Sequence, residues 1–108
     1  MKYLFLICID PDVELRPEQV DVRGWLTEMT QRQVRLTGDR LRPVSDATSV
    51  SVRDEQLLVS DGPFAETKEQ IGGFDIVECA DLDQAIDVAA KHPVARFGTI
   101  DVRPFWQQ

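Results

Sequence analysis

Two parts of the sequence hold the side chains best suited to chemistry: the single histidine, His92, and the charged segment at residues 61–74, which reads DGPFAETKEQIGGF. Histidine can act as an acid or a base near neutral pH, and a carboxylate such as Asp61 or Glu66 could orient it. We therefore predict His92, Asp61 and Glu66 as catalytic residues. This set suits acid–base elimination or isomerisation of a small aromatic or carbonyl compound.

The same segment predicts a substrate-binding set. A long loop with mixed charge, glycines and aromatic residues is a typical place for a small-molecule pocket. A lysine in such a loop could hold an anionic group of the substrate. The predicted binding residues are Asp10, Phe64, Lys68, Glu69 and Phe74.

Each of these residues also has a purely structural interpretation. His92 could interact with the carbonyl end of its own helix, which favours a positive charge. Asp61 precedes Gly-Pro, and an aspartate there often forms a turn by bonding its own backbone. Phe64 and Phe74 could simply fill the core. The sequence leaves both interpretations open for every one of them.

Composition excludes several classes of protein. The net charge is −7, which argues against binding the phosphate backbone of nucleic acids. The longest apolar run, residues 3–9, is far shorter than the roughly 18 residues of a membrane helix and has no signal-peptide cleavage site. We therefore expect a cytoplasmic protein that binds neither nucleic acid nor membrane.

The metal-binding residue types are few. Two cysteines and one histidine cannot supply any of the usual structural zinc sites, so we predict no metal and no cofactor. The weaker alternative is a metal ion held by His92 together with aspartate or glutamate. Both cysteines lie in apolar runs, which predicts buried, reduced thiols. Four arginines close in sequence are expected on solvated faces, with a local basic site as the alternative: Arg32, Arg35, Arg40 and Arg42.

Hydrophobic patterning predicts a mixed chain of helices and strands. Strands are expected at residues 2–10, 40–44, 49–53, 56–60, 73–80 and 99–103, and helices at residues 17–37 and 82–91. Gly38 would follow the first helix at its C′ position, and residues 81–84 resemble a capping box for the second. Without the hairpin at residues 49–60 the order is βαββαβ, which predicts a ferredoxin-like α+β sandwich.

The hairpin has a predicted register. A two-residue turn at Asp54-Glu55 would pair Val52 with Leu57 and place their side chains on one face of the ribbon. The next pair on that face would be Val50 with Val59. Asp-Glu fits a primed turn poorly, so a longer loop is the alternative.

Four stretches of the chain carry a resemblance to a known family: MKYLFLI at residues 1–7, DGPFAETKEQIGGF at 61–74, DLDQAIDVAAKHP at 81–93 and DVRPFW at 101–106. Together they resemble the DGPF-domain branch of the YCII-related family. The resemblance implies one domain over residues 1–108, a ferredoxin-like fold, and a homodimer that forms an α+β barrel.

The resemblance says less about activity, which is mostly undefined in this family. One relative in the broader group is a dehydrochlorinase of a chlorinated hydroxyquinol, and DGPF proteins resemble domains associated with sigma factors of the extracytoplasmic-function type. The broader family is credited with a His/Asp pair, on the first helix and just before the proline that ends the second. Here residues 23–25 hold no histidine and His92 takes the position before that proline, so the pair is not reproduced.

Topology brings the predicted site together. In this fold the antiparallel sheet has the order fourth, first, third, second core strand. That order gathers one end of the sheet from distant parts of the chain: Asp10, Asp61, Glu66, Lys68, Glu69 and His92. We expect a small-molecule enzyme or binding protein; the alternative is a non-catalytic interaction module linked to transcription through a sigma factor.

Overall fold

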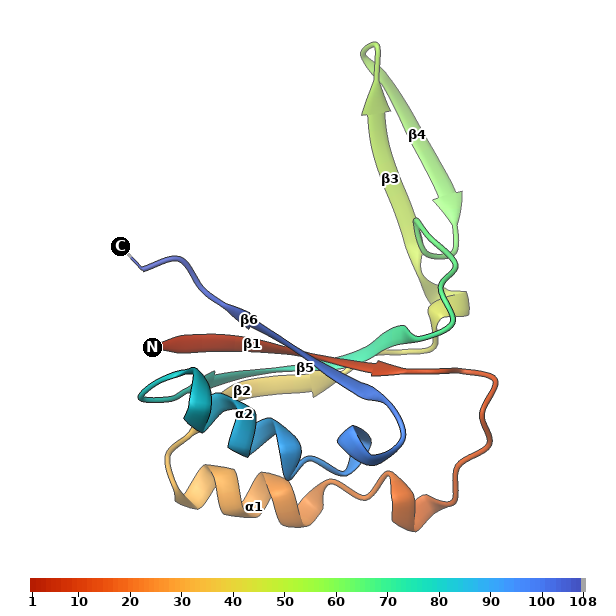
Figure 1. Cartoon of the computed structure of the whole chain (residues 1–108). Helices are drawn as coiled ribbons and strands as arrows, with labels where there is room; N and C mark the ends of the chain where they lie inside the picture. The colour runs from red at the N-terminus through yellow and green to blue at the C-terminus, as the bar shows by residue number, and fades with distance from the viewer. Residues whose placement is uncertain (108) are drawn as a thin grey trace.

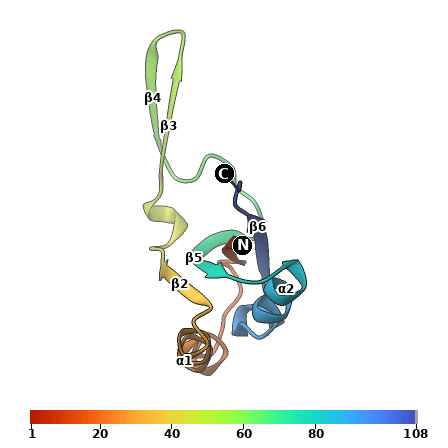
Figure 2. The ribbon, with the colours of Figure 1, turned by 90° about the vertical axis from the view of Figure 1, so that its left-hand side faces the viewer.

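The computed structural model describes residues 1–107, which form a sheet covered by helices on one face, with a long hairpin on the other side (Figures 1 and 2). The four-stranded antiparallel sheet has the order β2-β5-β1-β6. Its strands are β1 (Lys2–Ile9), β2 (Arg35–Arg40), β5 (Gln70–Glu78) and β6 (Thr99–Pro104). The helices are α1 (Arg23–Gln31) and α2 (Leu82–Ala90). This confirms the ferredoxin-like α+β fold and the predicted strand order. The predicted domain at residues 1–108 stays a prediction, and its last residue lies outside the described residues.

The core lies between the sheet and the two helices. Alternate residues of β1 face it, and Tyr3 and Phe5 are fully buried there against Met29 of α1 and Val88 of α2. Burying a side chain of this size contributes about 1.5–3 kcal/mol. The Trp25 indole donates a hydrogen bond of 3.0 Å to the Val88 carbonyl, which joins α1 to α2.

The first helix is shorter than predicted. Residues 17–37 form a 3-10 turn (Pro17–Gln19), then α1, and then β2 instead of one helix. Gln33 adopts a φ of 59°, and the amide of Val34 bonds the Met29 carbonyl at 2.9 Å, so the helix ends in a Schellman motif without glycine. Gly38, predicted at the helix end, lies within β2 instead.

The strand predicted at residues 40–44 is therefore wrong by several residues. β2 ends at Arg40, and Pro43 precedes a 3-10 turn (Val44–Asp46). The second helix agrees with the sequence. Asp81 accepts a hydrogen bond from the Gln84 amide at 2.9 Å, and the Gln84 side chain accepts one from the Ala80 amide at 2.6 Å.

The hairpin of β3 (Thr48–Arg53) and β4 (Gln56–Asp61) forms a separate two-stranded sheet. Its register pairs Val52 with Leu57 and Val50 with Val59, as predicted. The longer loop is ruled out, because Asp54 and Glu55 form the turn with φ values of 51° and 65°. Both views show the ribbon rising from the sheet on the side away from the helices.

Both cysteines are free, as predicted, although only Cys79 is buried and Cys8 is half-buried. Burial raises the pKa of each thiol. Among residues 1–107, no helix is long and apolar enough to cross a membrane.

Candidate functional site

Most of the predicted site residues lie on the open surface. Asp61 ends β4, and Phe64, Glu66 and Lys68 lie exposed in the loop that follows it. This loop belongs to the hairpin side of the sheet (Figure 2). Phe64 is 96% exposed, so it does not fill the core.

Two further predicted residues sit at the end of the sheet where β1 ends and β5 begins. Asp10 is half-buried and accepts a hydrogen bond of 2.9 Å from the Asp12 amide. Glu69 is half-buried and accepts one of 2.7 Å from the Thr99 hydroxyl, at the start of β6. Both carboxylates thus stabilise the local backbone and strand connections.

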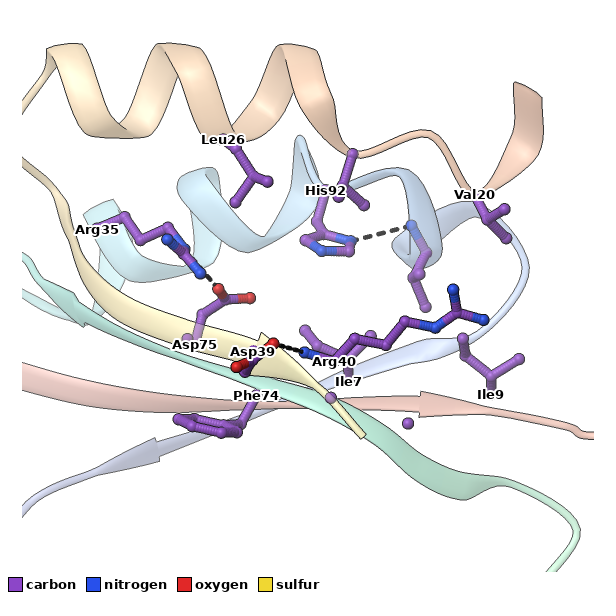
Figure 3. A pocket seen from close by; sticks show the side chains of 15 residues that line it. Ile7, Ile9, Val20, Leu26, Arg35, Asp39, Arg40, Phe74, Asp75 and His92 are labelled. Atoms are coloured by element: carbon purple, nitrogen blue, oxygen red, sulfur yellow. Dashed lines mark hydrogen bonds and ion pairs between the residues drawn. The ribbon is translucent and has the colours of Figure 1, made fainter. Parts of the chain in front are cut away.

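A cavity of about 380 Å³ lies between the helix-covered face of the sheet and the chain around α1 (Figure 3). Of the predicted site residues, His92 and Phe74 are among those that line it, although the Phe74 ring itself points to the other face of the sheet (Figure 3). Its apolar wall consists of Ile7, Ile9, Val20, Val22, Leu26 and Val94. Among the residues that the structure describes, Asp75 and His92 are the only polar or charged ones that are buried, and both line this cavity.

Two other hollows on the protein differ from this cavity in the exposure of their ionisable side chains. They measure about 420 and 460 Å³, so they are not smaller. Every ionisable side chain in their walls is exposed to solvent. We therefore take the cavity with buried polar groups as the candidate site, because burial is what perturbs acid–base chemistry.

His92 is fixed by the turn that follows α2. Its Nδ1 accepts a hydrogen bond of 3.1 Å from the Val94 amide, and its ring packs edge-on against Trp25 with 4.8 Å between ring centroids. Burial lowers the pKa of His92 to about 4, so the ring is neutral at pH 7. Because Nδ1 accepts, the proton of the neutral ring is on Nε2.

The Nε2 atom of His92 faces the cavity. No residue of the described chain accepts its hydrogen bond, yet no buried side-chain nitrogen or oxygen in residues 1–107 lacks a partner. Nε2 is therefore not sealed in protein, and its free N–H is available to a molecule in the cavity.

Asp75 and Arg35 form an ion pair across two neighbouring strands. The distance from Arg35 Nε to Asp75 Oδ1 is 2.7 Å, and the two side chains are 21% and 8% exposed. Burial raises the pKa of Asp75 above its usual value, although the hydrogen bond and charge of Arg35 oppose this. Asp75 Oδ2 has no protein partner in the described chain, which leaves it open to the cavity.

Gly38 makes room for this ion pair. It lies opposite Asp75 in the β2–β5 register. A Cβ atom at this position would run into Asp75 Oδ1 and the Phe74 carbonyl oxygen, and would lie 2.7 Å from Arg35 Nη2. The glycine is therefore required by the charge pair that crosses it.

The segment at residues 61–74 reaches the cavity through its last residues only. The register shifts between Ile7 and Cys8, which pair with Gly73 and Ile71, so Gly72 forms a bulge. Gly72 and Gly73 contribute backbone to the cavity floor. The Phe74 ring points to the opposite face of the sheet (Figure 3).

The sequence analysis missed Asp75 and the pairing role of Arg35. Asp75 shares a strand face with Gly73, Val77 and Cys79, all of which are buried. An aspartate at an inward position of a strand signals a buried carboxylate, and this alternation was readable from the sequence. The helix predicted at residues 17–37 includes Arg35, so the sequence does not show that Arg35 lies in β2, next to β5.

The arrangement combines a hydrogen-bond donor with a carboxylate base. A neutral histidine whose Nδ1 accepts a backbone amide can polarise a carbonyl through Nε2–H. A carboxylate with a raised pKa is a better base than one in water. Among residues 1–107, no group of three or more His, Cys, Asp or Glu residues could hold a metal ion.

The fold and the cavity together define a small ferredoxin-like α+β protein with two buried polar side chains in a ligand-sized space. The chain belongs to the YCII-related domain family, whose model matches residues 1–107. It is similar to the uncharacterized protein R00369 of Rhizobium meliloti (strain 1021), with 43% identity over 67 residues. Those residues are 60% of this chain and 54% of that protein, so the match spans about half of the relative's length.

Proposed function

We propose that the protein binds a small aromatic or carbonyl compound in the cavity around His92 and performs acid–base chemistry on it. The observation that carries this proposal is that Asp75 and His92, the two buried polar residues of the described chain, line one cavity with an apolar wall. Within the family, the segment at residues 61–74 supports assignment to the DGPF-domain branch.

The proposed reaction is a proton transfer next to a carbonyl group. The free oxygen of Asp75 takes a proton from the carbon beside the carbonyl, and the electrons of that C–H bond form the C=C bond of an enolate. His92 donates its Nε2–H to the developing oxyanion. Asp75 then returns to carbon either this proton or, after exchange of its carboxyl group with D₂O, a deuteron, so the step needs no further reactant. A positioned base contributes about 10²–10⁴-fold and an oxyanion donor about 10²–10³-fold.

Arg35 has a positioning role in this scheme. It bonds one oxygen of Asp75 and leaves the other oxygen directed at the cavity. The predicted roles of Asp61 and Glu66 remain predictions, and the test below separates them from Asp75.

Acetophenone, a small aromatic ketone, is a suitable probe. Exchange of its methyl protons for deuterium in D₂O, followed by NMR, reports proton transfer directly. We expect the wild-type protein to accelerate the exchange, and Asp75→Asn and His92→Gln to lose most of the acceleration. Asp87→Asn, an exposed carboxylate on α2, is the matched control and should exchange like the wild type.

Two results would contradict the assignment. If the wild type does not accelerate exchange beyond buffer, the proposed chemistry fails. If Asp61→Asn or Glu66→Gln abolishes the acceleration while Asp75→Asn keeps it, the base lies in the exposed loop and not in the cavity.

We further propose that the protein acts as a homodimer. The sheet face opposite the helices carries apolar side chains that no helix covers: Leu4, Leu6, Phe74 and Ile76. A second subunit packed on this face would remove them from water. Light scattering at micromolar concentration should give twice the mass of the chain, and a monomeric mass would contradict this.

A second candidate function is a non-catalytic interaction module linked to transcription through a sigma factor. The observation that favours it is the projecting hairpin, whose apolar face has Val50, Val52, Leu57 and Val59 between 59% and 67% exposed. A purified extracytoplasmic-function sigma factor should then bind the wild type and not Leu57→Lys. Lack of binding to the wild type would contradict this function.

A further inference from the structure

We propose that the ligand of this cavity carries a carboxylate and that Arg40 binds it at the cavity rim. This inference rests on the proposed function, because it presumes that a small molecule occupies the cavity. It adds the chemical class of that molecule: a compact keto acid with an apolar body.

The strand register directs Arg40 toward the cavity. In the β2–β5 pair, Gly38 lies opposite Asp75 and Arg40 opposite Gly73, both on the helix-covered face. Asp39 lies between them, opposite Phe74, and faces the other side of the sheet. Figure 3 shows the Arg40 side chain extending past Ile7 toward the space between Val20 and Ile9.

Arg40 carries a charge at the cavity rim that no described side chain pairs with. Arg35 is neutralised by Asp75, and His92 is uncharged at neutral pH. Within residues 1–107 the Arg40 guanidinium has no ion pair and no hydrogen bond, and the Asp39 carboxylate accepts only the backbone amide of Arg40, at 2.9 Å. Asp39 brings the formal charge of the lining residues to zero, but it lies on the other face of the sheet, so on the helix-covered face Arg40 is the charged side chain without a partner.

The neighbouring arginines are already satisfied, which sets Arg40 apart. Arg32 pairs with Glu28 at 3.0 Å, and Arg42 pairs with Asp46 at 3.1 Å. A planar guanidinium next to an apolar wall matches a carboxylate attached to an apolar body.

The space supports one orientation of such a ligand. Gly72 and Gly73 leave the floor below Arg40 free of side chains. An apolar body could lie between Ile9 and Leu26, with its carboxylate at Arg40 and its carbonyl oxygen at His92 Nε2. The carbon beside the carbonyl then lies on the side of Asp75.

Benzoylpropionate and its neutral amide, benzoylpropionamide, test this inference. They share one apolar body and one ketone and differ in the charge of the far group. Calorimetric titration of the wild type should show about tenfold tighter binding of the carboxylate, as expected for one charge-assisted interaction. The preference should shrink at higher salt, because the site is near solvent.

Arg40→Gln should bind both compounds with the affinity of the amide for the wild type. Arg42→Gln is the matched control, since it removes an arginine that is two residues away and outside the cavity. It should keep the full preference for the carboxylate.

The outcomes separate the two proposals. Binding of both compounds with equal affinity to the wild type overturns the role of Arg40 and leaves the cavity function standing. A preference that survives in Arg40→Gln, or that is lost in Lys68→Gln instead, also overturns it. If neither compound binds the wild type, the proposed function fails and this inference fails with it.

Discussion

The cavity and the loop between β4 and β5 both carry polar side chains that are candidates for chemistry. The two regions differ in their exposure to water. Asp61 at the end of β4 and Glu66 and Lys68 in the loop are exposed to solvent, where salt and water screen their charges. The cavity holds only a few polar groups, but Asp75 and His92 are 5% and 4% exposed.

Burial of polar side chains, and not their number in the sequence, indicates the site here. A dense run of charged residues marks the loop in the sequence, whereas the cavity contributes single residues from distant elements. Removal from water shifts the pKa of both buried groups, upward for Asp75 and downward for His92. Proton affinities moved in this way distinguish a chemical site from a solvated surface.

The largest expected difference between the two regions is in packing. Phe5→Ala, in the core between the sheet and the helices, should lower the free energy of unfolding by about 3–5 kcal/mol, because its side chain is fully buried. Phe64→Ala, in the exposed loop, is the same change and should cost under about 0.5 kcal/mol. Urea denaturation measures both.

The same two variants can also contradict the difference in exposure between the two regions. A cost of more than about 2 kcal/mol for Phe64→Ala would show that the loop is covered in the protein in solution. The two regions would then not differ in exposure as described.

The next largest effect concerns pH. His92 has a folded pKa of about 4, below its ordinary value of 6.5, so the unfolded chain binds the proton more readily. Its contribution to stability is complete above pH 6.5 and is lost as the pH falls toward 4, by up to about 3 kcal/mol. The raised pKa of Asp75 acts in the opposite direction at acidic pH.

Comparison of the wild type with His92→Gln isolates this effect. The difference between their unfolding free energies should shrink as the pH falls from 7 to 4. A difference that stays constant over this range would contradict a buried, neutral histidine.

Two glycines provide a smaller and sharper contrast. Gly38→Ala should destabilise the protein by about 2–3 kcal/mol, because the new methyl group collides with the Arg35–Asp75 ion pair and a backbone carbonyl. Gly24→Ala should stabilise it by about 0.5–1 kcal/mol, because α1 has nothing within 4 Å of that position and alanine favours a helix. Thermal denaturation of both variants measures this, and equal effects would contradict it.

The smallest expected effect lies at the tip of the hairpin. Asp54 and Glu55 both adopt positive φ, which Asn-Gly accepts more readily. Replacing the pair by Asn-Gly should stabilise the hairpin by about 0.5–1 kcal/mol. Hydrogen exchange of the β3 and β4 amides should slow accordingly, while exchange in β1 should not change.

Much of the fold was predictable from sequence. Continuous apolar residues identified β1, the alternation around Asp54-Glu55 gave the hairpin register, and residues 81–84 marked the start of α2. The predicted end of the first helix is wrong because glycine is the usual signal for a helix end, and here Gln33 takes the left-handed position. Because the predicted helix extends to residue 37, it includes the start of β2 and with it Arg35.

The candidate site was predictable only in part. His92 stands out as the single histidine, and its place between α2 and Pro93 was readable. Its protonation state was not, because that depends on packing against Trp25 and on the Val94 amide. The loop carboxylates form a dense charged run that is obvious in the sequence. Asp75 can be recognised only because it shares the inward positions of the strand with apolar residues.

The proposed function depends on a buried, neutral His92 that presents Nε2–H to a ligand in the cavity. NMR of the histidine ring tests this most directly, because the chain has one histidine and therefore one set of signals. We predict an Nε2–H tautomer at pH 7, a pKa of about 4, and a shift of these signals when benzoylpropionate is added. A ring that titrates near pH 6.5, or that does not respond to a ligand bound with measurable affinity, would contradict this state of His92.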